Sequence, residues 1–158
     1  MVRVHVVVVA VLLLVSCVCS AQQQSTCNLD DGRQVYIRYN PVTTKTDKAP
    51  YGKPFTPGGT AMTLFTEAPL NFGGTTIPIG AYSVYPIPAK ERWTLAVNKN
   101  VTAGAAYDER QDIAKAAIET DPVSPSEALE VAFAHVGDKC TLRIYFGKTA
   151  SFATFVVK

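Results

Sequence analysis

The sequence has little of what most catalytic and nucleic-acid-binding proteins use. Its 158 residues include only two histidines, and 15 Lys+Arg nearly balance 13 Asp+Glu, for a formal net charge of +2. Charged residues make up 18%, below the roughly 25% that is usual in globular chains. So small a net charge produces no field that would gather nucleic acid, and we expect no nucleic-acid partner. The apolar run at residues 6–15 is shorter than the about 20 residues a membrane-spanning helix needs, so no transmembrane segment is expected.

Residues 1–21 have the features of a secretory signal peptide. Arg3 precedes the apolar run at residues 6–15, and small residues at 19–21 come just before the polar Gln22. This order predicts cleavage between Ala21 and Gln22 and a mature protein outside the cytoplasm, either periplasmic or secreted. A second interpretation stays open, because residues 14–17 resemble the lipobox of bacterial lipoproteins. In that case Cys17 would become a lipidated first residue that anchors the protein to a membrane.

Cleavage would change how many cysteines the mature protein contains. Of the four cysteines only Cys27 and Cys140 would remain, and His135 would be the remaining histidine. Two cysteines cannot make a structural zinc site alone, and the acidic clusters lack the loop spacing of a calcium motif. We therefore expect no metal and no cofactor. In an oxidising compartment the two cysteines would form one disulfide, with two buried free thiols as the alternative.

The pattern of the mature chain is that of an all-β protein. Apolar and polar residues alternate at 34–40, as they do in half-buried strands, and prolines and glycines punctuate the chain. Further strands are predicted at residues 61–65, 70–72, 75–79, 81–87, 92–98, 128–136, 140–146 and 151–157. Residues 112–120 are rich in alanine, and a strand is favoured there over a helix. We expect a signal peptide (1–21), an N-terminal arm (22–33) and one antiparallel β-sandwich-like domain (34–158).

One loop is a candidate binding site. Residues 49–60 carry Tyr51, Lys53 and Phe55 among prolines and glycines. Loops held on a β scaffold often carry binding residues, and aromatic rings with one cation suit a sugar ring or an extended peptide. The alternative is that Tyr51 and Phe55 cap the core.

No residues form a recognisable catalytic set. A serine or cysteine nucleophile needs a base, and His135 has no companion motif, so we expect no catalytic residues. The sequence favours a non-enzymatic module, outside the cytoplasm, that binds a small ligand, a glycan or an envelope protein. The alternative function is a hydrolase of envelope glycans that uses paired carboxylates such as Glu67 or Glu91.

An ordered series of short motifs between residues 35 and 157 resembles a bacterial family of secreted domains of unknown function, numbered 2911. The series contains Pro-Tyr-Gly-Lys at 50–53, Gly58, Ile-Pro-Ile-Gly-Ala-Tyr-Ser at 77–83, Trp-Thr-Leu at 93–95 and Val-Asn-Lys at 97–99. The resemblance implies a secreted β-sandwich-like domain with a strand near residue 112, and it brings no established activity. Phe55, Thr56, Gly59 and Thr60 stand where the family usually has Trp, Arg, Ala and Asn. Any binding that relatives perform through that arginine and asparagine would be missing here.

Overall fold

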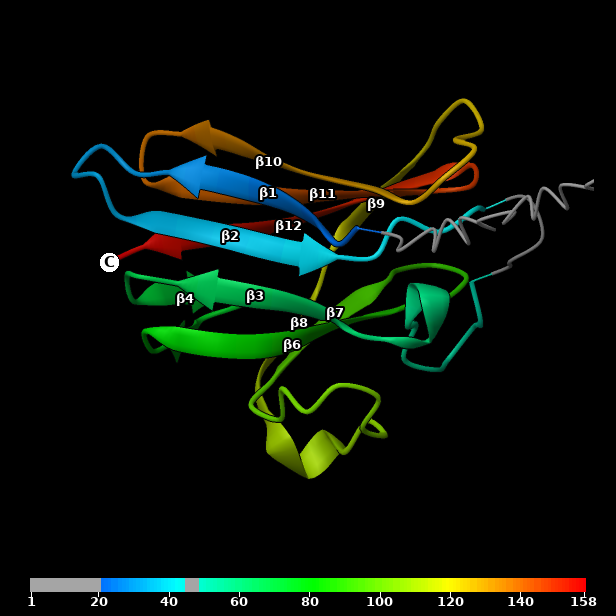
Figure 1. The fold of residues 1–158 in the computed structure, drawn as a ribbon, viewed down its shortest axis with the longest axis horizontal. Coiled ribbons are helices and arrows are strands. Elements are labelled where there is room, and N and C mark those ends of the chain that lie inside the picture. The colour runs from blue at the N-terminus through cyan, green and yellow to red at the C-terminus, as the bar shows by residue number, and fades with distance from the viewer. Residues whose placement is uncertain (1–20, 45–48) are drawn as a thin grey trace, which may run out of the picture.

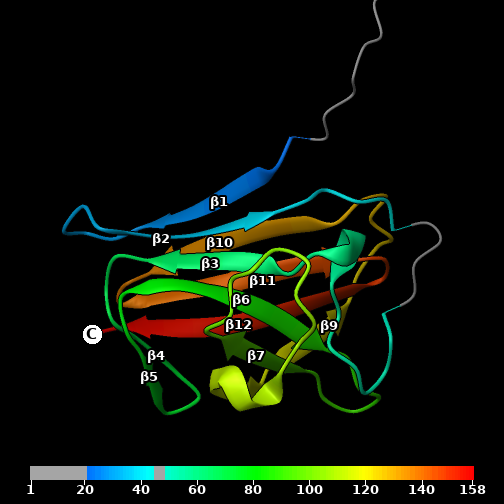
Figure 2. The ribbon, with the colours of Figure 1, turned by 60° about the horizontal axis from the view of Figure 1, so that its bottom comes forward.

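The computed structural model describes residues 21–44 and 49–158, so most of the expected signal peptide, with Cys17, lies outside the described residues. Within them the chain is all-β, and its strands form two antiparallel sheets packed face to face as a β-sandwich (Figures 1 and 2). This confirms the fold class expected from the alternating pattern. No helix in the described part of the chain is long and apolar enough to cross a membrane.

The first sheet has a simple order that departs once from chain order. Its strands follow one another as β1-β2-β3-β6-β7-β8, so the chain leaves the sheet between β3 and β6 to build part of the second one. The bounds are β1 (Gln23–Asn28), β2 (Gln34–Tyr39), β3 (Met62–Thr66), β6 (Gly80–Ile87), β7 (Thr94–Asn98) and β8 (Asp112–Ala117). Their outward-facing residues form the surface that is important below.

The second sheet is built around the C-terminal meander. Its order is β10-β11-β12-β4-β5, and the short β9 also pairs with β12. The bounds are β10 (Glu130–Val136), β11 (Lys139–Phe146), β12 (Thr149–Val157), β4 (Leu70–Phe72), β5 (Thr75–Ile77) and β9 (Glu119–Pro122). In Figure 2 the orange and red strands of this sheet lie behind the green strands of the first.

The core lies between the sheets because each strand turns one apolar face inward. In β11 the buried residues alternate with exposed or half-buried ones, and the same period occurs in β2. Ile37, Leu64, Leu142 and Phe155 have no exposed surface. Burying each such side chain contributes about 1.5–3 kcal/mol to the free energy of unfolding.

A disulfide joins the two sheets. Cys27 of β1 is bonded to Cys140 of β11, with Cα atoms 6.1 Å apart and a sequence separation of 113. The expected pairing is therefore confirmed, and the alternative of two free thiols is not what the structure contains. On the same side of the sandwich, the backbone N–H of Phe133 in β10 donates to Oγ of Ser25 in β1, at 2.9 Å.

On the opposite side of the sandwich, the two sheets approach each other closely at a glycine. Gly73, in the turn between β4 and β5, has a φ of +58°, and a Cβ there would lie 2.3 Å from Cβ of Ala116 in β8. The absence of a side chain lets the β4–β5 hairpin lie directly against the edge of the first sheet. Gly73 is thus needed both for the turn and for the close approach.

Two sequence expectations need adjustment. Residues 22–33, expected as an arm, contain β1, whose buried Cys27 makes it part of the sandwich. Residues 112–120 are extended rather than helical, but they divide into β8 and β9, which belong to different sheets.

Candidate ligand-binding site

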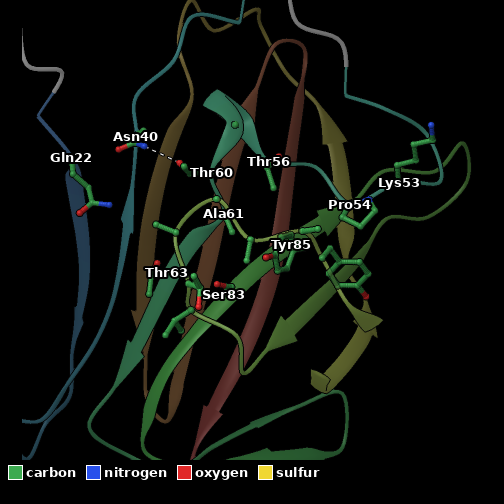
Figure 3. A pocket seen from close by; sticks show the side chains of 18 residues that line it. Gln22, Asn40, Lys53, Pro54, Thr56, Thr60, Ala61, Thr63, Ser83 and Tyr85 are labelled. Atoms are coloured by element: carbon green, nitrogen blue, oxygen red, sulfur yellow. Dashed lines mark hydrogen bonds between the residues drawn. The ribbon is translucent and has the colours of Figure 1, made fainter. Parts of the chain in front are cut away.

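A pocket of about 480 Å³ lies on the outer face of the first sheet, away from the core. Strands β3 and β6 form its floor, and two loops, residues 53–60 and 101–107, form its walls (Figure 3). The lining side chains are mostly hydroxyls and amides: Gln22, Asn40, Lys53, Thr56, Thr60, Thr63, Ser83, Tyr85, Thr102 and Tyr107. A volume of this size is typical of sites for small ligands.

The floor presents hydroxyl groups that the fold does not use. Thr63 and Ser83 are cross-strand partners on β3 and β6, and Tyr85 follows two residues along β6 on the same face. Ser83 is 4% exposed and Tyr85 is 3% exposed. Within the described part of the chain, neither hydroxyl has a hydrogen-bond partner, although both residues line the pocket. Their oxygens are not among the fully buried atoms that lack a partner, so they remain accessible from the pocket and can bond with something that enters it.

The first wall is held to the end of β6 by backbone hydrogen bonds. The N–H of Gly52 donates to the carbonyl of Pro88, and the N–H of Phe55 donates to the carbonyl of Pro86, both at 2.7 Å. Pro86 has no N–H of its own, but its carbonyl still extends the pairing beyond Met62, the first residue of β3. Between these two bonds, Lys53 is placed at the rim of the pocket. Figure 3 shows its side chain extending outward from the wall.

The same wall is tied to β2 through side chains. Asn40, just after β2, donates through Nδ2 to Oγ1 of Thr60 at 2.9 Å (Figure 3). This bond uses one donor of the amide and one lone pair of the hydroxyl. The carbonyl oxygen of Asn40 and the hydroxyl proton of Thr60 remain for a ligand.

The second wall is part of the connection between β7 and β8, residues 99–111. Asn98 is 1% exposed, and its Nδ2 donates to Oδ1 of Asp112 at 2.8 Å and to the carbonyl of Asp108 at 2.9 Å. The Tyr107 hydroxyl donates to Oδ2 of Asp112 at 2.5 Å. The ring of Tyr107 packs edge-on against Tyr85, with centroids 4.9 Å apart. These bonds fix the base of the connection over the sheet, so residues 101–106 overhang the pocket.

Shifted pKa values keep Tyr107 and Asp108 of this wall in the protonation states that form its hydrogen bonds, and this stabilises the connection. Burial raises the pKa of Tyr107 above its ordinary value of 10, and its hydrogen bond to Asp112 raises it further. Hydrogen bonds from Arg110 lower the pKa of Asp108 to about 2. Tyr107 therefore stays protonated and Asp108 stays ionised across the physiological range. The cluster of Asp108, Glu109 and Asp112 is occupied by these bonds and by the ion pair between Lys115 and Glu109, at 2.7 Å.

The structure separates the three residues expected to bind a ligand. Lys53 lines the pocket just described. Phe55 does not: it is 7% exposed and its ring packs on Phe146 of β11, with centroids 4.6 Å apart, so it belongs to the core. Tyr51 is 65% exposed and lies with Trp93 and Lys148 at a different hollow. The three side chains therefore do not form one site.

The two carboxylates of the alternative hydrolase do not form a pair. Glu67 follows β3 beside the start of β6, where its Oε2 accepts the N–H of Gln34 at 2.7 Å. Glu91 lies beyond the other end of β6, a strand of 8 residues. At roughly 3.3 Å per residue the two are separated by about 25 Å, much more than the about 5–10 Å between paired acids in glycoside hydrolases.

Other candidate groups have structural partners. Nε2 of His135, the histidine expected to be unremarkable, lies 2.7 Å from the carbonyl of Gly137 in the β10–β11 turn. Asp31 pairs with Arg33 at 2.6 Å, and this hydrogen bond lowers the pKa of the Asp31 carboxyl. Within residues 21–44 and 49–158 there is no group of three or more His, Cys, Asp or Glu residues that could hold a metal ion.

Sequence reasoning missed the floor of the pocket. Ser83, Tyr85 and Thr63 occupy ordinary outward positions of strands, where polar residues carry no special signal. The sequence contains one indication: the connection at residues 99–111 is much longer than the usual 2–5 residues of a hairpin loop, and long connections are often functional. Since it joins two paired strands, it has to fold over one face of the sheet.

A known protein family matches nearly the whole of the part of the chain that forms the two sheets. The family described as a protein of unknown function (DUF2911) matches residues 20–154. The chain belongs to this family. The DUF2911 match covers both sheets, the disulfide and both walls of the pocket, which confirms the resemblance drawn from the short motifs. No curated protein matches the chain, and no solved structure matches it.

Proposed function

We propose that this DUF2911 protein is a non-enzymatic β-sandwich module that binds a small polar ligand in the outer-face pocket. One observation carries the proposal: the residues Ser83 and Tyr85 are almost buried, and their hydroxyls, which have no partner among the described residues, open into the pocket. A ligand that pairs with these hydroxyls binds the folded state and not the unfolded one, so it stabilises the fold.

The composition of the lining supports binding without catalysis. Among the eighteen lining residues, all within the described ranges, Lys53 is the one charged side chain, and there is no histidine, cysteine or carboxylate. Histidine and carboxylates are the usual bases that activate a hydroxyl nucleophile, and the hydroxyls of this lining have no such base among the lining residues. Glu67 and Glu91, the acids of the hydrolase alternative, lie at opposite ends of β6 and outside this lining.

We place this function outside the cytoplasm, in the periplasm or secreted. The predicted signal peptide supports this location, and so does the Cys27–Cys140 disulfide, because disulfides persist mainly in oxidising compartments. The two walls of the pocket do not depend on the disulfide directly. They stand on the first sheet, whose edge strand β1 the disulfide holds against the second sheet.

The test compares hydroxyls that serve the fold with hydroxyls that do not. Thr66, which is 3% exposed, donates to the carbonyl of Ala68, so Thr66→Val should lower the midpoint of thermal unfolding. Ser83→Ala and Tyr85→Phe lose no protein hydrogen bond and should leave the midpoint unchanged or raise it. Midpoints are measured by circular dichroism.

Binding is tested on the same proteins with a panel of neutral sugars, sugar acids, amino acids, dicarboxylates and nucleosides. At least one class should raise the midpoint of the wild type and not that of Thr63→Trp, which fills the pocket from its floor. Thr154→Trp, on the exposed face of β12, is the matched control and should respond as the wild type does. If no class raises the midpoint, or if Thr63→Trp responds fully, the proposal is wrong.

A further inference from the structure

The pocket also indicates the chemistry of its ligand. Resting on the proposed function, we infer that the ligand is an uncharged polyhydroxylated molecule, a neutral sugar, bound by the hydroxyls of Thr63, Ser83 and Tyr85. Three features of the pocket support this ligand: the hydrogen-bonding character of its lining, the placement of charge around it and the geometry of the hydroxyls on its floor.

Most of the polar groups in the lining can both donate and accept hydrogen bonds. Serine, threonine and tyrosine hydroxyls do both, and the amides of Gln22 and Asn40 present two donors and one acceptor oxygen each. A ligand that satisfies such a lining must itself offer donors and acceptors in a similar ratio. Sugar hydroxyls have this property, whereas an anion only accepts hydrogen bonds and an ammonium group only donates them.

Charge is absent from the depth of the pocket. The lining holds no carboxylate that would neutralise a cation, and its one cation, Lys53, is an exposed rim residue whose side chain extends outward (Figure 3). An ion in the pocket would lose hydration without gaining a buried counter-charge, and that loss costs several kcal/mol. The lining therefore discriminates against charged ligands of the same shape.

The hydroxyl oxygens on the floor of the pocket are held in place before any ligand arrives. Ser83 and Tyr85 belong to β6, which is hydrogen-bonded on both sides, to β3 and to β7. The ring of Tyr85 is further held by its edge-on contact with Tyr107. Preorganised donors and acceptors lower the entropy cost of binding and allow a site to reject analogues that lack a matching hydroxyl.

The experiment uses sets of sugars that share a ring and differ in charge. Glucose, galactose and mannose are the neutral probes; glucuronate and galacturonate are anionic; glucosamine and galactosamine are cationic. Affinities for the full chain are measured by isothermal titration calorimetry and by ligand-observed NMR. At least one neutral sugar should bind, at least tenfold more tightly than its acid or amine. Ser83→Ala should weaken that binding at least fivefold, and Tyr85→Phe should do the same.

Lys53→Gln distinguishes a neutral ligand from an anionic one. It should weaken the binding of the neutral sugar less than Ser83→Ala does, because Lys53 is an exposed rim residue whereas Ser83 lies on the floor. Lys90→Gln, in the exposed β6–β7 turn, is the matched control. Tighter binding of the acid, lost in Lys53→Gln, would overturn the inference and leave the proposed function in place.

Failure of the inference and of the proposed function have different signatures. If only amino acids, dicarboxylates or nucleosides bind and Thr63→Trp abolishes that binding, the site is real and the sugar assignment is wrong. If sugars bind equally to the wild type and to Thr63→Trp, they bind elsewhere and the inference is wrong. If nothing in the wider panel binds at this pocket, both the inference and the proposed function are wrong.

Discussion

Tyr107 lies edge-on against Tyr85, with ring centroids 4.9 Å apart, and its hydroxyl donates to Asp112 at the start of β8. One side chain thus links the floor of the pocket, the overhanging connection and the edge of the first sheet. The connection has few other backbone bonds, since between residues 101 and 106 the N–H of Ala105 donates to the carbonyl of Thr102 in a local turn. The position of the second wall therefore depends strongly on Tyr107.

The first prediction removes the hydroxyl of Tyr107 and keeps its ring. Tyr107→Phe should lower the free energy of unfolding by about 1–2 kcal/mol, because the Asp112 carboxylate loses a charge-assisted hydrogen bond in a partly buried place. Urea unfolding followed by fluorescence measures the change. Tyr51→Phe is the control: Tyr51 is 65% exposed, and a surface change of this kind should stay within about 0.5 kcal/mol. Equal effects of the two substitutions would contradict the assigned role of Tyr107.

The second prediction concerns alkaline pH. The folded protein raises the pKa of Tyr107 above its ordinary value of 10, so the folded state holds this proton more tightly than the unfolded state. The corresponding stability is fully present below about pH 10 and is lost as the pH rises above it. The difference in unfolding free energy between wild type and Tyr107→Phe should narrow as the pH rises above about 10. A constant difference over that range would show that the pKa is not raised.

The strands that the sequence predicts well are those in which burial alternates along the chain. In β11, Cys140, Leu142, Ile144 and Phe146 are buried in turn, so the apolar period alone identifies the strand and its inward face. Strand β1 was not expected because its sequence, Gln-Gln-Ser-Thr-Cys-Asn, is polar. It is a strand because β2 pairs with it along its whole length and Cys27 holds it to the second sheet. Both causes are tertiary contacts, which the sequence of β1 by itself does not reveal.

The candidate site was predicted less well than the fold. The binding role of Lys53 stays a prediction: the residue lines a pocket, whereas Phe55, which was assigned to the same surface, lies in the core. The N–H of Phe55 pairs with Pro86, and its ring turns toward Phe146 in the other sheet, a direction that loop composition does not reveal. Ser83 and Tyr85 become buried only because a connection distant in sequence covers them. Burial on the outer face of a sheet is not encoded in the strand itself.

The third prediction concerns the disulfide. In the chain-entropy model, closing a loop across 113 residues stabilises the folded state by about 4–5 kcal/mol, so the double variant Cys27→Ala/Cys140→Ala should lose stability on that scale. Urea unfolding measures the loss. Part of it reflects the two buried sulfur atoms, and reduction of the wild type gives the effect of the bond without deleting them. A thiol assay on the denatured mature protein should detect no free thiol; two would show that the bond does not form.

The fourth prediction is a substitution that stabilises the protein. Ser151 in β12 is 1% exposed, and its Oγ is the buried side-chain polar atom for which the described residues provide no hydrogen-bond partner. Ser151→Ala removes the unsatisfied hydroxyl and leaves a space of one atom, so the free energy of unfolding should rise by about 1 kcal/mol. Ser25→Ala is the matched control and should destabilise, because Oγ of Ser25 accepts the N–H of Phe133. Destabilisation by Ser151→Ala would show that this hydroxyl has a partner in solution.

The fifth prediction is the mature N-terminus. Strand β1 begins at Gln23 and Gln22 lines the pocket, so processing that removed residues beyond Ala21 would take away part of the site and then an edge strand. Mass spectrometry of the exported protein should therefore find Gln22 as the first residue, in agreement with the small residues that precede it. A first residue at Cys17 carrying acyl chains, with partition of the protein into detergent, would instead establish the lipoprotein route. Because both products retain Gln22 and β1, each should bind the same neutral sugar, and a difference between them would show that residues before Gln22 block the pocket.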